Sequence, residues 1–137
     1  MTPDKQKTHA TVIGRIDSGE GKPDIIRSEY DAEYSYMPDG FELQYDESEA
    51  HVTIICSEGM TIINRNGIPN SRMVFVPGET IDATYALAEG AFDIEVECTF
   101  LKLDRHEGHG ALRIAYNLLS GGQLMSNNRL MISYKLC

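Results

Sequence analysis

The sequence predicts an all-β protein whose strands form an antiparallel meander closed into a barrel of about eight to ten strands. Three observations predict this fold. Apolar and polar residues alternate with a period of two in several long runs, as they do in strands that have one buried face. Short segments rich in glycine, proline, asparagine and aspartate separate the runs. None of these connections has the dozen or so residues of a parallel crossover, and no long Greek-key return is visible, so a closed meander is favoured over a sandwich.

The clearest strand covers residues 25–36. Three tyrosines stand on its even positions and a row of acidic residues stands on its odd positions, which indicates one buried and one solvated face. The same alternation predicts strands at residues 92–100, 112–118 and 130–136. Six weaker runs complete the sheet, at residues 10–16, 41–45, 52–56, 60–64, 72–76 and 81–87.

Two local signals qualify this pattern. Asn66 and Gly67 give the strongest hairpin signal in the chain, because both residues tolerate the positive φ of a type I′ turn. Residues 83–89 could also form two helical turns, but Gly90 follows at once and so short a helix is not stable alone.

Size and charge limit the domain organisation and the partners. The 137 residues are expected to form one domain, residues 1–137, with a disordered arm at residues 1–7. The net charge is -9, because 12 lysines and arginines face 21 aspartates and glutamates. No run of basic residues could neutralise phosphates, so we expect no nucleic-acid partner and no binding to membranes.

The composition also predicts a cytoplasmic location. The N-terminus contains no apolar run of the kind found in signal peptides, and no stretch approaches the ~20 apolar residues of a membrane helix. Cys56, Cys98 and Cys137 are odd in number and widely spaced, so they indicate reduced thiols rather than a disulfide framework.

Five segments stand in an order that is typical of one protein family. They are GFELQYD at residues 40–46, TIINRNG at residues 61–67, FVPG at residues 75–78, LRIAYNL at residues 112–118 and NRLMISY at residues 128–134. Together they resemble the YwiB-like family of bacterial proteins, also called DUF1934, over most of the chain from about residue 25 onward. The resemblance implies a calycin-like or lipocalin-like β-barrel and assigns no biochemical activity.

Tyrosines are the main candidates for ligand binding. All of them fall on the apolar parity of their strands, where they would line a barrel interior with aromatic rings and hydroxyls suited to a small amphipathic ligand. The alternative is that tyrosine fills the core while its hydroxyl reaches water at the barrel mouth. The candidates are Tyr30, Tyr34, Tyr36, Tyr85, Tyr116 and Tyr134.

Arg65 is the one charged candidate. If it faces inward, it requires a carboxylate partner or an anionic ligand, because a buried unpaired charge is costly. If it faces outward, it is an ordinary surface charge. The alternation around it does not decide between the two orientations.

The sequence supports no metal site, no cofactor and no defined catalytic machinery. His106 and His109 flank Glu107 in a glycine-rich loop, which offers too few ligands and no rigid frame for zinc. Cys56 and Cys98 stand on the buried parity without basic neighbours that would activate a thiol. Whether the protein is an enzyme stays open at this point, with the balance against it.

Three functions therefore remain, in order of preference. The first is a barrel that binds a small amphipathic or anionic molecule in a tyrosine-lined interior. The second is a structural or interaction module without a ligand, acting as a monomer or a weak homodimer. Its candidate contact is an outward-facing apolar group on neighbouring strands, Ile55, Ile63, Val74 and Val76. The third is an enzyme with its site in the barrel mouth.

Overall fold

The computed structural model describes residues 5–137 and contains ten strands in an antiparallel meander that closes into a barrel. The strands are β1 (Lys5–Asp17), β2 (Asp24–Met37), β3 (Gly40–Asp46), β4 (Ala50–Ser57), β5 (Met60–Gly67), β6 (Asn70–Phe75), β7 (Thr80–Leu87), β8 (Gly90–His106), β9 (His109–Ser120) and β10 (Gln123–Leu136). Each strand pairs with its neighbours in the sequence, and β1 also pairs with β10 to close the barrel. The predicted fold class is confirmed.

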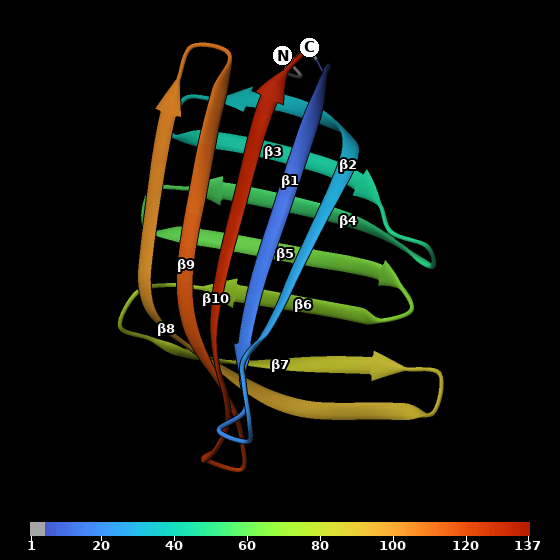
Figure 1. The fold of residues 1–137 in the computed structure, drawn as a ribbon, viewed down its shortest axis with the longest axis vertical. Coiled ribbons are helices and arrows are strands. Elements are labelled where there is room, and N and C mark those ends of the chain that lie inside the picture. The colour runs from blue at the N-terminus through green and yellow to red at the C-terminus, as the bar shows by residue number, and fades with distance from the viewer. Residues whose placement is uncertain (1–4) are drawn as a thin grey trace.

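The barrel has two walls whose strands cross. β3 to β7 run across the view in Figure 1, while β1, β2, β9 and β10 run steeply in front of them. β8 connects the walls, since its first part pairs with β7 and its second part pairs with β9. No helix in residues 5–137 is long and apolar enough to cross a membrane.

Apolar side chains from both walls fill the centre of the barrel. The large side chains that are almost completely buried include Phe41, Leu43, Val52, Ile54, Phe75, Val96, Leu112 and Ile132. Burying each side chain of this size contributes about 1.5–3 kcal/mol. The middle of the barrel is therefore a packed core, and space for a ligand must be sought at its ends or in its walls.

Two local expectations need correction. Residues 5–7 belong to β1 and pair with β2, so the expected arm is strand from Lys5 onward, and residues 1–4 lie outside the described part of the chain. The turn after β5 lies at residues 68–69 rather than at Asn66–Gly67, because Gly67 still pairs with Ala50. A side chain at Gly67 would overlap the backbone of the neighbouring β4 connection, which explains the glycine.

A β-bulge in β8 ends the predicted alternation at Thr99, so it holds for Ile94, Val96 and Cys98 but not for Phe100. The pairing with β9 steps from Cys98 directly to Phe100, so Thr99 is the extra residue. As a result Phe100 points outward and is 48% exposed, whereas Leu101 packs against the core. Alternation alone places Phe100 inside, because a bulge leaves no mark in the apolar pattern.

The barrel wall is weakest between β6 and β7. Only two residue pairs join these strands, whereas every other neighbouring pair of strands shares at least five. Residues 72–75 of β6 have strand partners only in β5, and residues 80–84 of β7 have them only in β8. The two strands therefore separate toward their connection and leave an opening in the wall.

Candidate functional site

The predicted tyrosines do not form one lining, and three of them gather at one end of the barrel. Tyr34 and Tyr134 are buried, and their ring centroids lie 4.8 Å apart. Phe41 packs on Tyr134, with 4.7 Å between the two ring centroids. Tyr36 lies at the same end of the barrel but is 58% exposed, with the guanidinium carbon of Arg105 5.1 Å from its ring centroid. The sequence prediction of an interior position is therefore wrong for Tyr36.

A cleft of about 560 Å³ opens beside these rings at the barrel mouth. Its cation, Arg105, donates hydrogen bonds from Nη2 to the Met37 carbonyl at 2.9 Å and from Nη1 to the Pro38 carbonyl at 3.3 Å. Burial, followed by a hydrogen bond with Tyr34, raises the pKa of Tyr134 well above its usual range. The mouth therefore holds a protonated phenol and a guanidinium that is hydrogen bonded to the β2–β3 turn. Both groups are suited to stabilising the packing at this end of the barrel.

A second group of candidates lies farther along the interior. Tyr30 stacks on Tyr45 with ring centroids 4.2 Å apart. Arg65 faces inward, because its cross-strand partner on β4 is the fully buried Val52. Its Nε lies 3.2 Å from Glu47 Oε1, and both side chains are about one-quarter exposed. The orientation that the sequence left open is thus inward, and a carboxylate of the protein itself supplies the partner.

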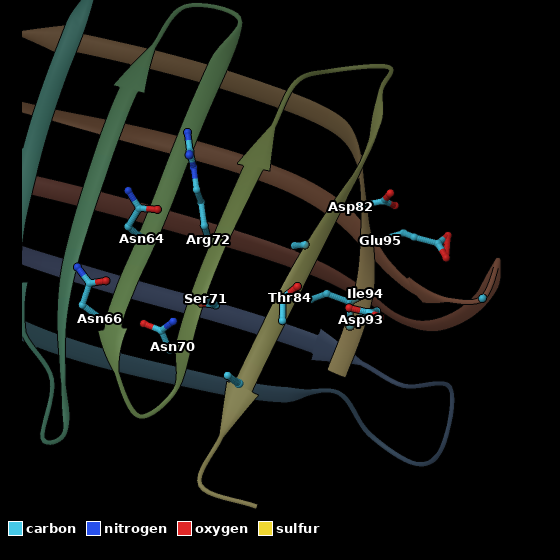
Figure 2. A pocket seen from close by; sticks show the side chains of 13 residues that line it. Asn64, Asn66, Asn70, Ser71, Arg72, Asp82, Thr84, Asp93, Ile94 and Glu95 are labelled. Carbon is cyan, nitrogen blue, oxygen red and sulfur yellow. The ribbon is translucent and has the colours of Figure 1, made fainter. Parts of the chain in front are cut away.

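Another hollow lies in the outer wall, at the opening between β6 and β7. It has a volume of about 930 Å³ and polar side chains around its rim. Figure 2 shows the amide and guanidinium groups of β5 and β6 on one side and the acidic groups of β7 and β8 on the other. The polar residues of the rim include Asn64, Asn70, Arg72, Asp82, Thr84, Asp93 and Glu95. We call this hollow the β6–β7 cleft.

The β6–β7 cleft contains a buried polar atom without a partner. Ser71 is 6% exposed and lines the cleft, and its Oγ makes no hydrogen bond. Ser71 pairs across the sheet with Tyr85, one of the predicted ligand-binding residues. Ala83 and Ile94, from the inward-facing positions of β7 and β8, line the same hollow. The cleft therefore reaches from the outer surface to the inner face of the wall.

Sequence reasoning missed this cleft for a physical reason. Polar residues on outward positions look like an ordinary solvated face, and the length of a ladder between two strands is not encoded in their alternation. The small side chains of Ala83 and Ala86, which line the cleft, are a local sign in the sequence that space is left here.

The remaining candidates lack activated groups. Burial raises the pKa of the Cys56 thiol to about 11 and raises that of Cys98 as well, so both stay protonated at neutral pH. Among residues 5–137, no group of three or more His, Cys, Asp and Glu side chains is placed to hold a metal ion. The expected outward apolar group is also incomplete, because Ile63 is 3% exposed and belongs to the core.

A ten-stranded antiparallel barrel with a packed centre and hollows in its wall and at its mouth defines the structural class. The chain belongs to the family described as Domain of unknown function (DUF1934), which it matches over residues 11–132. Its structure is similar to the crystal structure of the ywiB protein from Bacillus subtilis, with a TM-score of 0.86 and 20% sequence identity. The match covers 97% of this chain and 93% of that chain. The predicted family is confirmed, and at this identity the structural likeness supports the fold alone. No curated protein matches the sequence.

Proposed function

We propose that this protein binds a small polar or amphipathic molecule in the β6–β7 cleft. The observation that carries the proposal is the buried Ser71 hydroxyl, which has no hydrogen-bond partner and lines the β6–β7 cleft. A buried hydroxyl without a partner costs about 1–3 kcal/mol. A ligand hydroxyl, carbonyl or amide would remove that cost, and a volume of about 930 Å³ lies within the usual range for small-molecule sites.

The charges at the rim indicate which molecules fit. Asp82, Asp93 and Glu95 oppose a single cation, Arg72. A lining with this excess of carboxylates disfavours anions and suits a neutral, hydroxyl-rich or cationic ligand. The inward-facing Ala83 and Ile94 offer apolar contact to the deeper part of such a molecule. Binding is favoured over catalysis, because burial raises the pKa values of the Cys56 and Cys98 thiols and of the Tyr134 phenol and keeps these groups protonated at neutral pH.

Filling the cleft tests the proposal. Thr84→Trp places a large ring at the rim, and Thr80→Trp places the same ring on the same face of β7, outside the lining. Native mass spectrometry of the protein purified from its own cells should show a one-to-one adduct in the wild type and in Thr80→Trp, and none in Thr84→Trp. A thermal-shift panel of polyols, nucleosides, amino acids and amines would identify the chemical class. The absence of any adduct together with an unchanged melting temperature across the panel would contradict the proposal and favour the interaction module.

A further inference from the structure

A second hollow lies on the outer wall formed by β1, β10, β9 and the end of β8. It has a volume of about 540 Å³ and combines three arginines with large apolar side chains. We call it the arginine groove and define it by Arg15, Arg113, Arg129, Ile13, Phe100 and Met131. It shares no lining residue with the β6–β7 cleft.

Strand register brings the three arginines together. Arg15 on β1 lies directly opposite Arg129 on β10. Two residues along β10, Met131 lies opposite Arg113 on β9. Residues two apart on a strand share a face, so the three guanidinium groups stand on one surface. Arg15 is far from the other two in the sequence, so the three arginines do not form a run of basic residues.

These arginines lack partners of the kind that Arg65 and Arg105 have. Arg65 pairs with Glu47, and Arg105 donates to two carbonyl groups. Within residues 5–137, no carboxylate lies within 4.0 Å of the three groove arginines and none of them donates a side-chain hydrogen bond. Like charges directly opposite each other in a sheet repel. A chain with 21 acidic residues nevertheless places Arg15 against Arg129.

The floor between the arginines is apolar. The bulge of β8 turns Phe100 outward, and Ile13 and Met131 stand half-buried beside it. Phe100 is 48% exposed and so presents its ring to the groove. The groove thus offers apolar contact and several guanidinium donors within one small space.

We propose that the arginine groove binds an amphipathic anion, meaning a carboxylate, phosphate or sulfonate joined to an apolar ring or chain. Arginine presents a planar fork of donors that matches such oxyanions, and it also packs on apolar groups. The volume of about 540 Å³ fits one small molecule. The net charge of -9 of the whole chain disfavours a long polyanion such as nucleic acid.

Two dyes that share one ring system test this chemistry. 1-Anilinonaphthalene-8-sulfonate carries an anionic group, and N-phenyl-1-naphthylamine is its counterpart without charge. Fluorescence titration should show at least tenfold tighter binding of the sulfonate to the wild type. Arg129→Ala should weaken sulfonate binding about tenfold, the effect of one charge-assisted contact, and leave the neutral dye unchanged. Arg129→Lys should fall between the two.

Lys135→Ala provides the matched control. It removes one positive charge from the same face of β10, about 20 Å along the strand from Arg129 at ~3.3 Å per residue. We expect less than a twofold change in sulfonate binding. Equal affinities of the two dyes, or equal effects of Arg129→Ala and Lys135→Ala, would overturn the proposal. Circular dichroism of each variant establishes that the barrel is intact.

Further titrations identify the source of the anion. We expect free laurate to displace the sulfonate dye, and we expect no sedimentation of the protein with phosphatidylcholine–phosphatidylglycerol vesicles. Sedimentation that requires Arg129 would keep the groove chemistry and assign it to a lipid headgroup. Binding of a single-stranded oligonucleotide that falls steeply with salt and requires Arg129 would overturn the proposal in favour of a polyanion. Thr84→Trp should leave dye binding unchanged, so a failure of this proposal is distinguishable from a failure of the β6–β7 site.

Discussion

Replacing Ser71 with alanine removes a hydroxyl that is buried and unpaired in the protein without ligand. The side chain is 6% exposed, and its Oγ has no hydrogen-bond partner. The folded state therefore bears the desolvation cost of this hydroxyl without compensation, whereas in the unfolded state water solvates it. Ser71→Ala should raise the free energy of unfolding by about 1 kcal/mol, because the relieved cost of about 1–3 kcal/mol exceeds the small loss of packing. For a chain of this size the melting temperature should rise by about 3 °C.

The matched control is Thr8→Val. Thr8 is also buried, but its Oγ1 donates a hydrogen bond of 2.7 Å to the Lys135 carbonyl across the β1–β10 seam. Removing that donor should lower the free energy of unfolding by about 1 kcal/mol, because the Lys135 carbonyl loses a hydrogen bond. The two hydroxyl deletions should therefore have opposite signs in urea unfolding followed by circular dichroism.

Ser71→Ala should have the opposite effect on ligand binding from its effect on stability. A molecule that hydrogen bonds to the Ser71 hydroxyl should bind about five- to tenfold more weakly to Ser71→Ala, since a neutral hydrogen bond contributes about 1 kcal/mol. If Ser71→Ala is more stable than the wild type without ligand but binds the ligand more weakly, the Ser71 hydroxyl serves ligand binding. If Ser71→Ala instead destabilised the protein as much as Thr8→Val does, the hydroxyl would have a partner in solution and the argument for the cleft would fail.

Three further predictions concern the core. Gly110→Ala places a Cβ 2.7 Å from the buried ring of Tyr134, so it should lower the free energy of unfolding by about 1–3 kcal/mol, while Gly14→Ala, with no atom within 4 Å of the new Cβ, should have little effect in the same urea titration. Iodoacetamide at pH 8 should label Cys137 quickly and the two buried cysteines only after unfolding, and rapid labelling of all three in the native protein would contradict the burial described here. Cys56 has its pKa raised from 9.0 to about 11 by burial, so its stabilising contribution is complete below pH 9 and is lost as the pH rises toward 11. Wild-type stability should therefore fall more steeply over that range than the stability of Cys56→Ala, and parallel curves would refute this assignment.

Alternation predicted the fold well because the side-chain period of a strand is fixed at two. It placed Tyr34 and Tyr134 inside, where both are buried. It failed at Phe100 because the bulge at Thr99 shifts the parity without changing the composition of the segment. It also placed Tyr36 inside, although inward parity leads to burial only where the opposite wall covers the residue.

The candidate sites were harder to predict, because they depend on which strands become neighbours. The orientation of Arg65 follows from its cross-strand partner Val52, which the local sequence does not reveal. The arginine groove depends on the register of three strands, with Arg15 and Arg129 separated by most of the chain. The β6–β7 cleft depends on a ladder that ends after two residue pairs. Each of these is a relation between distant residues, on which local periodicity carries no information.

The seam between β1 and β10 also affects how the chain reaches its native state. β10 follows the other nine strands in the sequence, so β1 can pair with β2 alone until β10 has been synthesised. Closing the seam joins residues as far apart as Thr8 and Leu136, which is the kind of long-range contact that slows folding. In the interval, β1 and β9 expose unpaired edges that can associate with other chains. Rapid synthesis of β10, or protection of these edges by a chaperone, should therefore limit aggregation in cells. Truncation within β10 should lead to aggregation rather than to a smaller barrel.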